Sequence, residues 1–209
     1  MQRIFHTPEG VRDIYSQECS RKQKLQEKLH RVFHQYGFED IETPTFEYFE
    51  VFSKEVGTIP SRELYKFFDR EGNTLVLRPD FTPSVSRACA TYFNPEKEVV
   101  SLCYTGNTFI NNSSFRGRLK ETTQMGVERM GDDSPEADAE ILAMTVECLL
   151  ATGLTEFQVS VGQVDYYKAI FAQTGMSQEE EEELRELISQ KNYFGVEAVS
   201  YTHLTLPTT

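Results

Sequence analysis

The chain has 209 residues, 39% of them hydrophobic and 26% charged, which is enough apolar material for the core of about one domain. Lysine and arginine number 21 against 33 acidic residues, and the resulting net charge of −12 disfavours binding to nucleic acid or to an anionic membrane. No apolar run could span a bilayer, no signal-peptide pattern is present, and the four widely spaced cysteines indicate reduced thiols in a cytoplasmic protein.

The hydrophobic pattern predicts helices and strands bounded by recognisable turn and capping residues. In chain order, the expected elements are helix 17–35, strand 38–41, an apolar helical turn over 46–52, hairpin strands 64–68 and 74–77, helix 82–92, long strands 99–110 and 119–127, a helix from Ser134 to Gly153, strand 157–161, and helices 164–172 and 178–189. Together they predict an α+β fold with an antiparallel sheet flanked by helices.

Local signals fix several of these boundaries. Apolar residues recur at three- and four-residue steps over 17–35, and Gly37 follows as a stop signal. The polar turn 69–73 predicts a hairpin, and the small polar residues 111–117 predict a loop between the two long strands. Ser134, with proline next and an acid after it, is a strong helix start.

The last dozen residues differ from the rest of the chain. Residues 198–209 carry no charge and no helical stripe, and they resemble the translated sequencing-adapter tails that end some fragmentary gene models. We interpret them as a non-native tail and exclude them from the fold. We therefore expect a domain over residues 1–197 and a natural protein that continues beyond it.

Two histidines stand at a spacing that metal ligands can have. His30 and His34 lie four residues apart on one helix face, but the glutamate of HExxH is missing and no third ligand is evident nearby. A solvated or packed histidine pair is the favoured interpretation. The cysteines lack metal-like spacing, and glycine motifs for phosphates are absent, so we expect neither a metal nor a cofactor.

The segment 77–83, Leu-Arg-Pro-Asp-Phe-Thr-Pro, leads from a hairpin strand into a helix. It places the carboxylate of Asp80 two positions from the hydroxyl of Thr82. A carboxylate at this point can accept a charge-assisted hydrogen bond from a ligand ammonium. The residues alone equally allow a simpler role, in which both side chains cap the helix.

A second segment covers both long strands, from Tyr104-Thr105-Gly106 to Glu128. Alternate side chains share one face of a strand, so Gln124 and Glu128 point the same way. They could serve a ligand or simply form a polar outer face of the sheet.

Both segments resemble the catalytic domain of histidyl-tRNA synthetase, which has a class II synthetase fold. The leader 7–13 and the stretch 37–47, which is similar to the dimerisation element motif 1, follow the same order. The segment 77–82 comes next, and the strand pair that ends in 117–128 resembles motif 2. The similarity covers about residues 6–197, so it implies a class II synthetase-like domain.

The chain departs from the synthetase family where motif 2 reads Phe-Arg-x-Glu. Counting back from Gly117 places Phe109 at the phenylalanine, Ile110 at the arginine and Asn112 at the glutamate. In the family that arginine holds the ATP α-phosphate. Losing one such preorganised donor typically costs about 3–4 kcal/mol, or about 10²–10³ in rate. Adenylation is therefore not expected.

The amino-acid side of the family's site is kept. Asp80, Thr82, Gln124 and Glu128 match the positions that surround histidine in the family, and Asp80 replaces a glutamate there. Arg118 in the loop is a further candidate, for a carboxylate or phosphate-like group. The resemblance thus implies a histidine-binding site without catalytic residues.

This pattern is similar to the ATP phosphoribosyltransferase regulatory subunits, a family of synthetase paralogues, on the strength of 77–83 and Arg87. The resemblance implies a non-catalytic subunit that activates a short catalytic subunit in the first step of histidine biosynthesis and carries histidine feedback. It also implies self-association through 37–47, with no nucleic-acid or membrane partner.

Two alternatives stay open. A fragment of an active histidyl-tRNA synthetase is one, because motif 3 would lie beyond residue 197. A regulator that reuses the fold to bind a different partner is the other.

Overall fold

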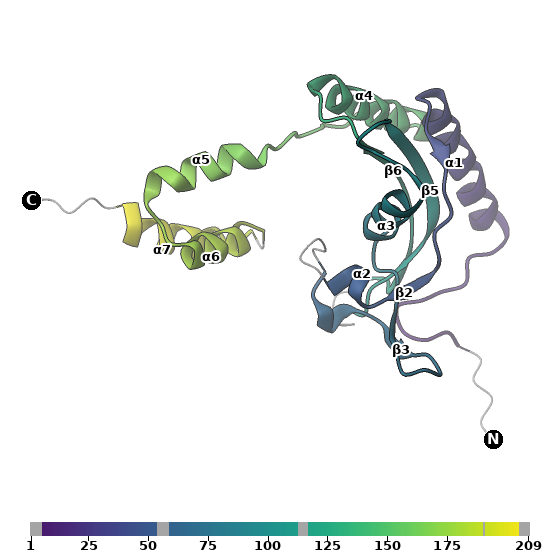
Figure 1. Ribbon diagram of the computed structural model, residues 1–209, viewed down its shortest axis with the longest axis horizontal. Helices are drawn as coiled ribbons and strands as arrows, with labels where there is room; N and C mark the ends of the chain where they lie inside the picture. The colour runs from purple at the N-terminus through teal and green to yellow at the C-terminus, as the bar shows by residue number, and fades with distance from the viewer. Residues whose placement is uncertain (1–5, 54–58, 113–116, 190, 205–209) are drawn as a thin grey trace, which may run out of the picture. The chain divides into compact units, whose positions relative to one another are not determined.

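The computed structural model describes residues 6–53, 59–112, 117–189 and 191–204. The chain forms two compact units, Met1–Phe157 and Gln158–Thr209 (Figure 1).

The described residues of the first unit form two sheets of three strands each. In one sheet, β5 lies between β1 and β6, pairing parallel with β1 and antiparallel with β6. In the other, β4 pairs antiparallel with β2 and β3. The strands are β1 (Glu39–Asp40), β2 (Phe46–Tyr48), β3 (Lys66–Phe68), β4 (Thr74–Leu77), β5 (Val100–Phe109) and β6 (Glu121–Met130). The expected hairpin and the long antiparallel pair are both confirmed.

Four helices and one 3₁₀ turn are also found in the described residues of the first unit. They are α1 (Ser16–Gln35), α2 (Glu50–Ser53), the 3₁₀ turn η1 (Ser61–Glu63), α3 (Thr82–Tyr92) and α4 (Pro135–Thr152). Gly37 follows α1 with a φ of +79°, where glycine carries no steric penalty. The hydroxyl of Ser134 accepts from the Ala137 amide at 3.2 Å, so the predicted N-cap of α4 is confirmed.

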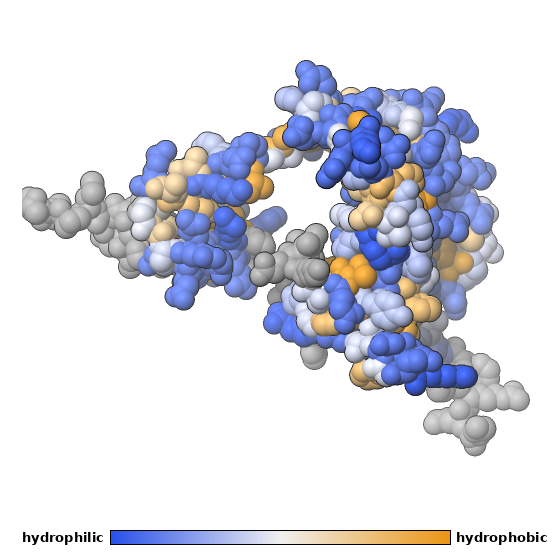
Figure 2. Space-filling model, viewed as in Figure 1, coloured by the Kyte–Doolittle hydropathy of each residue, from blue (hydrophilic) through white to orange (hydrophobic). Residues whose placement is uncertain are grey.

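The strands β5 and β6 separate two apolar clusters. On one face α3 packs through Phe81, Val85 and Cys89 against alternate residues of β5. On the other face α1 and α4 pack around the buried Cys103 and Met144. Figure 1 shows α1 and α3 on opposite sides of this sheet, and Figure 2 shows mostly hydrophilic residues on the outer sides of α1 and α4.

The secondary structure described in the second unit consists of helices joined by turns and preceded by an irregular segment. It consists of α5 (Val164–Thr174), α6 (Gln178–Ser189) and α7 (Tyr193–Leu204). Phe171 and Leu184 are its buried apolar side chains. The helix α7 runs into 198–209, and the interpretation of that stretch as non-native stays a prediction.

Two expected elements are wrong. The turn expected over 46–52 begins as strand β2, because its backbone pairs with β4 and only Glu50–Ser53 is helical. The strand expected over 157–161 is absent from the structure, which describes all five residues. Val159 and Val161 are exposed there, and no neighbouring strand satisfies the backbone groups that a strand requires.

None of the helices in the described ranges combines the length and the apolar character needed to cross a membrane.

Candidate functional site

The candidate site lies on the α3 side of strands β5 and β6. Register places Tyr104 opposite Gly126 and Gly106 opposite Gln124, while Glu128 pairs with Leu102. These positions alternate along their strands, so their side chains share one face. The common face predicted for Gln124 and Glu128 follows from this register.

Two glycines clear the space that larger side chains occupy. A Cβ on Gly126 would lie 2.4 Å from the Tyr104 hydroxyl. A Cβ on Gly106 would lie 2.5 Å from Nη2 of Arg78 and 2.7 Å from the Phe81 ring. All three contacts are shorter than atoms tolerate, so glycine at these strand positions permits close approach rather than a turn.

The start of α3 brings its polar residues to this face. The Thr82 hydroxyl donates to Glu128 Oε1 at 2.6 Å. Asp80 Oδ1 accepts from the backbone amide of Phe81 at 2.6 Å and from the side-chain Nε2 of Gln124 at 3.3 Å. The N-cap residue of the helix, Phe81, makes no side-chain capping hydrogen bond. Thr82 therefore bonds to Glu128 on strand β6 and does not cap the helix.

Tyr104 completes a group that we name the carboxylate cluster: Asp80, Thr82, Tyr104, Gln124 and Glu128. The Tyr104 hydroxyl lies 3.5 Å from Glu128 Oε1 and 3.5 Å from Gln124 Nε2. Its ring stacks on Phe81 with centroids 4.3 Å apart and planes 8° apart. Sequence reasoning gave Tyr104 no role, although its two-residue spacing from Gly106 was the available signal.

The electrostatics of the cluster favour a cationic ligand. Burial raises the pKa of Glu128, and the nearby Asp80 charge raises it further against the hydrogen bond from Thr82. Burial also raises the pKa of Tyr104, and both carboxylates add to the effect. The Asp80 charge disfavours the ionised form of the half-buried Glu128, and a bound ammonium would relieve this repulsion.

The predicted residues do not all come together. Asp80, Thr82, Gln124 and Glu128 meet through the contacts above. Arg118 is exposed and has no hydrogen bond or ion pair within the described part of the chain.

The motif 2 positions carry no charge toward this face. The Ile110 amide donates to the Lys120 carbonyl at 2.9 Å, and Asn112 Nδ2 donates to the Leu119 carbonyl at 3.4 Å. Neither side chain offers a cation to a phosphate. The predicted loop over 111–117 lies partly outside the described residues.

Arg78 is a buried arginine near the cluster, and its Nε and Nη1 donate to backbone carbonyls. Its Nε donates to the Asn107 carbonyl at 2.8 Å, and Nη1 donates to the Thr43 carbonyl at 2.8 Å. The guanidinium lies 4.0 Å from the centre of the Phe81 ring. Burial lowers the pKa of Arg78. These bonds hold strands and loops together and assign the side chain a structural role.

Comparison with known proteins places the chain in a family. The family model described as histidyl-tRNA synthetase matches residues 10–208. The chain therefore belongs to the histidyl-tRNA synthetase family.

Curated relatives of the chain share a more specific name than the family does. A curated ATP phosphoribosyltransferase regulatory subunit from Acetivibrio thermocellus is 42% identical over 199 residues, which cover 95% of this chain and 48% of the relative. The same-named subunit from Ruminiclostridium cellulolyticum is 41% identical over 195 residues, 93% of this chain and 46% of the relative. The resemblance to these regulatory subunits is confirmed, and the chain spans about half the length of the curated relatives it matches.

A solved structure supports the same fold. A crystal structure described as an ATP phosphoribosyltransferase regulatory subunit/histidyl-tRNA synthetase from Bacillus halodurans has a TM-score of 0.86 at 30% identity. The match covers 100% of this chain and 53% of that one. The expected class II synthetase-like α+β fold is confirmed.

Proposed function

We propose that the protein is a non-catalytic regulatory subunit of ATP phosphoribosyltransferase, which acts in the first step of histidine biosynthesis, and that the carboxylate cluster binds free histidine. The observation that carries the proposal is a separation within the site. The amino-acid side keeps its carboxylates and hydrogen-bonding groups, whereas Ile110 stands where nucleotide activation needs an arginine. The names of the two curated relatives reported above support the same conclusion.

Histidine would bind through its ammonium group. Asp80 and Glu128 supply the negative charge, while Thr82 and Gln124 fix the direction of the carboxylates through their hydrogen bonds. Such charge-assisted bonds are roughly twice as strong as neutral ones. Burial disfavours the negative charge of Glu128, and an ammonium beside the carboxylate would stabilise that charge.

Regulation follows from linkage. Histidine changes the activity of a catalytic partner only if it binds one quaternary state more tightly than another, and the coupling equals that difference in binding free energy. The subunit itself needs no phosphate-binding arginine for this role. Ile110, with no donor in its side chain, is compatible with sensing and incompatible with adenylation.

The partners in this proposal are a short catalytic subunit and a second copy of the chain. Self-association would use 37–47, where Glu47 accepts from Arg87 at 2.7 Å and holds the segment against α3. Net negative charge supports a role without nucleic acid or a membrane surface. Four free cysteines support a reducing, cytoplasmic location.

Reconstitution tests the function. The complete subunit is mixed with a short-form phosphoribosyltransferase, and phosphoribosyl-ATP formation is followed with and without histidine. We expect activity only when both chains are present, inhibition by histidine, and weaker inhibition in Glu128→Gln. Catalytic activity that is independent of this subunit would contradict the proposal.

Two further measurements separate the alternatives. Histidine-dependent exchange of pyrophosphate into ATP by the isolated subunit would identify an active synthetase instead. Calorimetry that detects no heat with histidine would favour a regulator for a different ligand.

A further inference from the structure

Four potential metal ligands meet on the face of the sheet opposite the carboxylate cluster. His30 Nε2 lies 2.7 Å from Asp40 Oδ1, and His34 Nε2 lies 3.1 Å from Asp40 Oδ2. The thiol of Cys103 lies 3.3 Å from Asp40 Oδ1. One donor atom from each of the four residues lies within 4.8 Å of every other, and we name this group the His₂AspCys cluster.

Three chain segments build the cluster. The two histidines lie one turn apart on α1, which places both imidazoles on one side of the helix. Asp40 on β1 pairs in register with Cys103 on β5, so these side chains share a face of the parallel ladder. Sequence analysis found no third ligand near the histidines, because the other two residues come from the distant parallel pairing of β1 with β5.

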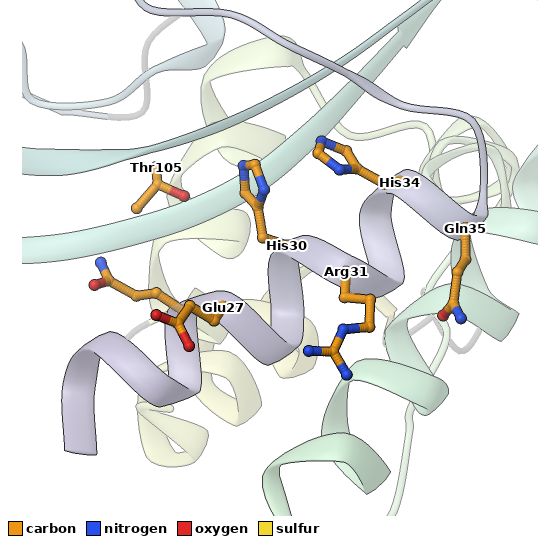
Figure 3. Close-up of a pocket in the computed structure, with 7 residues that line it drawn as sticks. Glu27, His30, Arg31, His34, Gln35 and Thr105 are labelled. Carbon is orange, nitrogen blue, oxygen red and sulfur yellow. The ribbon is translucent and has the colours of Figure 1, made fainter. Parts of the chain in front are cut away.

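The cluster is reachable from solvent on one side and closed on the other. His30 and His34 line an open depression of about 700 Å³ beside α1. Figure 3 shows both imidazoles on the side of α1 that faces the strand carrying Thr105, while Arg31 and Gln35 project away from them. Cys103 is fully buried at the base. An ion could enter past the histidines and meet the thiol last.

We propose that the His₂AspCys cluster is a binding site for a divalent transition metal ion, with Zn²⁺ as the best match. Two imidazoles, one carboxylate and one thiolate are all zinc ligands, and four protein ligands satisfy a tetrahedral ion. Magnesium and calcium prefer all-oxygen sites, so this mixture of nitrogen, oxygen and sulfur disfavours them.

Zinc would require the donor atoms to rearrange, because atoms that lie up to 4.8 Å apart would have to draw closer. Zinc bonds of about 2.0–2.3 Å at tetrahedral angles place ligand atoms about 3.3–3.8 Å apart. The His30–Asp40 and His34–Asp40 pairs would open slightly, by rotation of exposed or half-exposed side chains. Without a metal, Asp40 satisfies the same groups by hydrogen bonding, and the Cys103 thiol gives up its proton when an ion binds.

The site would be structural. Four protein ligands leave no open position for substrate, which is typical of structural zinc. The ion would connect α1 to the centre of the β1–β5–β6 sheet. Because only the folded chain brings the four ligands together, binding should raise the melting temperature.

Cobalt substitution provides a direct test. The tag-free 209-residue chain, reduced and freed of metal by a chelator, is titrated with Co²⁺ and then with Zn²⁺. We expect one Co²⁺ per chain, intense visible bands of tetrahedral coordination, a near-ultraviolet thiolate-to-cobalt band, and displacement of both signals by Zn²⁺. The melting temperature should rise when Zn²⁺ is added.

Variants assign the ligands. His34→Gln and Cys103→Ser should each weaken Co²⁺ binding by more than about tenfold, since even groups that only orient a ligand are worth about 10–100-fold. His6→Gln and Cys148→Ser are matched controls outside the cluster and should bind as the parent does. Circular dichroism checks that each variant folds, and His34→Gln alters a side chain that is 47% exposed.

The outcomes are decisive in both directions. Tetrahedral bands that both His34→Gln and Cys103→Ser weaken, with loss of the thiolate band in Cys103→Ser, support the site. Failure of the folded parent chain to bind one Co²⁺ would overturn it, and Asp40 would then only orient the histidines. Equal binding by the parent and both cluster variants would also overturn it, because the ion would lie elsewhere.

Discussion

The two faces of the β5–β6 strand pair differ in what they bury. On the α3 face, polar side chains lie among the packed rings of Phe81 and Tyr104, and glycines leave room for them. On the α1–α4 face, an apolar core surrounds Cys103 and Met144. Because neighbouring residues of one strand point to opposite faces, a single residue step separates the proposed ligand site from the structural core.

This comparison predicts that the two faces respond differently to mutation. Changes on the α1–α4 face should alter the free energy of unfolding without altering histidine affinity. Changes on the α3 face should alter affinity, with smaller effects on stability.

The largest effect is expected from Met144→Ala on the α1–α4 face. Met144 is 3% exposed, and removing a buried side chain of this size costs about 2–5 kcal/mol through lost burial and a residual cavity. Urea unfolding should show this loss, while calorimetry on the folded protein shows unchanged histidine affinity. Leu142→Ala on the same helix is the control, since Leu142 is 37% exposed and should cost much less.

Glu128→Gln should have the next largest effect, and on binding. It removes the charge from a hydrogen bond to the ligand ammonium, which is worth about 1.5–3 kcal/mol, or roughly 10–100-fold in dissociation constant. Stability should hold or rise, because the variant no longer buries a charge. Calorimetry with histidine measures the change. Glu121→Gln, on the same strand but bonded to Asn107, should bind as the parent does.

Gly126→Ala tests the close approach of Tyr104. The new methyl group would meet the Tyr104 hydroxyl, and overpacking of this kind costs about 1–3 kcal/mol. We expect lower stability together with weaker histidine binding, because Tyr104 contacts both Glu128 and Gln124. Gly162→Ala, where nothing lies within 4 Å of the added atom, is the control. If Gly126→Ala matched the parent in stability and histidine affinity, Tyr104 would have no role in the site.

The smallest effect is expected from pH. The pKa of Glu128 is raised in the folded chain, so the protonated group contributes stability below the unfolded pKa, and this contribution disappears as pH rises through the folded value. Histidine affinity should rise over the same range, because the ammonium binds the ionised carboxylate. Unfolding and calorimetry from pH 4 to 8, each compared with Glu128→Gln, measure both trends. If the parent and Glu128→Gln showed the same pH dependence of stability and of histidine affinity, both expected trends would be contradicted.

The sequence predicted helices and strands correctly where local signals, such as capping residues, determine them. The helix over 82–92 is confirmed at both ends, and Ser134 caps α4 as expected. Residues 46–48 form a strand only because β4 lies beside them, and 157–161 lack such a partner among the described residues. Short aromatic and β-branched runs take their structure from tertiary neighbours, which a local pattern does not contain.

The same distinction holds for side chains that meet. Gln124 and Glu128 share a strand, so alternation predicted their common face. Tyr104 joins them through the β5–β6 register, and Asp40 reaches His30 through the pairing of β1 with β5. These long-range meetings depend on register and packing.

Arg78 has one more consequence, because it stands two residues before Asp80. Its amide donates to the Thr45 carbonyl at 2.9 Å, and its carbonyl accepts from the Phe109 amide at 3.0 Å. A shift of Asp80 on capturing an amino acid would therefore strain bonds that reach the segment expected to join two copies. Faster hydrogen exchange at the Arg78 amide on adding histidine would report this mechanical connection, and unchanged exchange would exclude it.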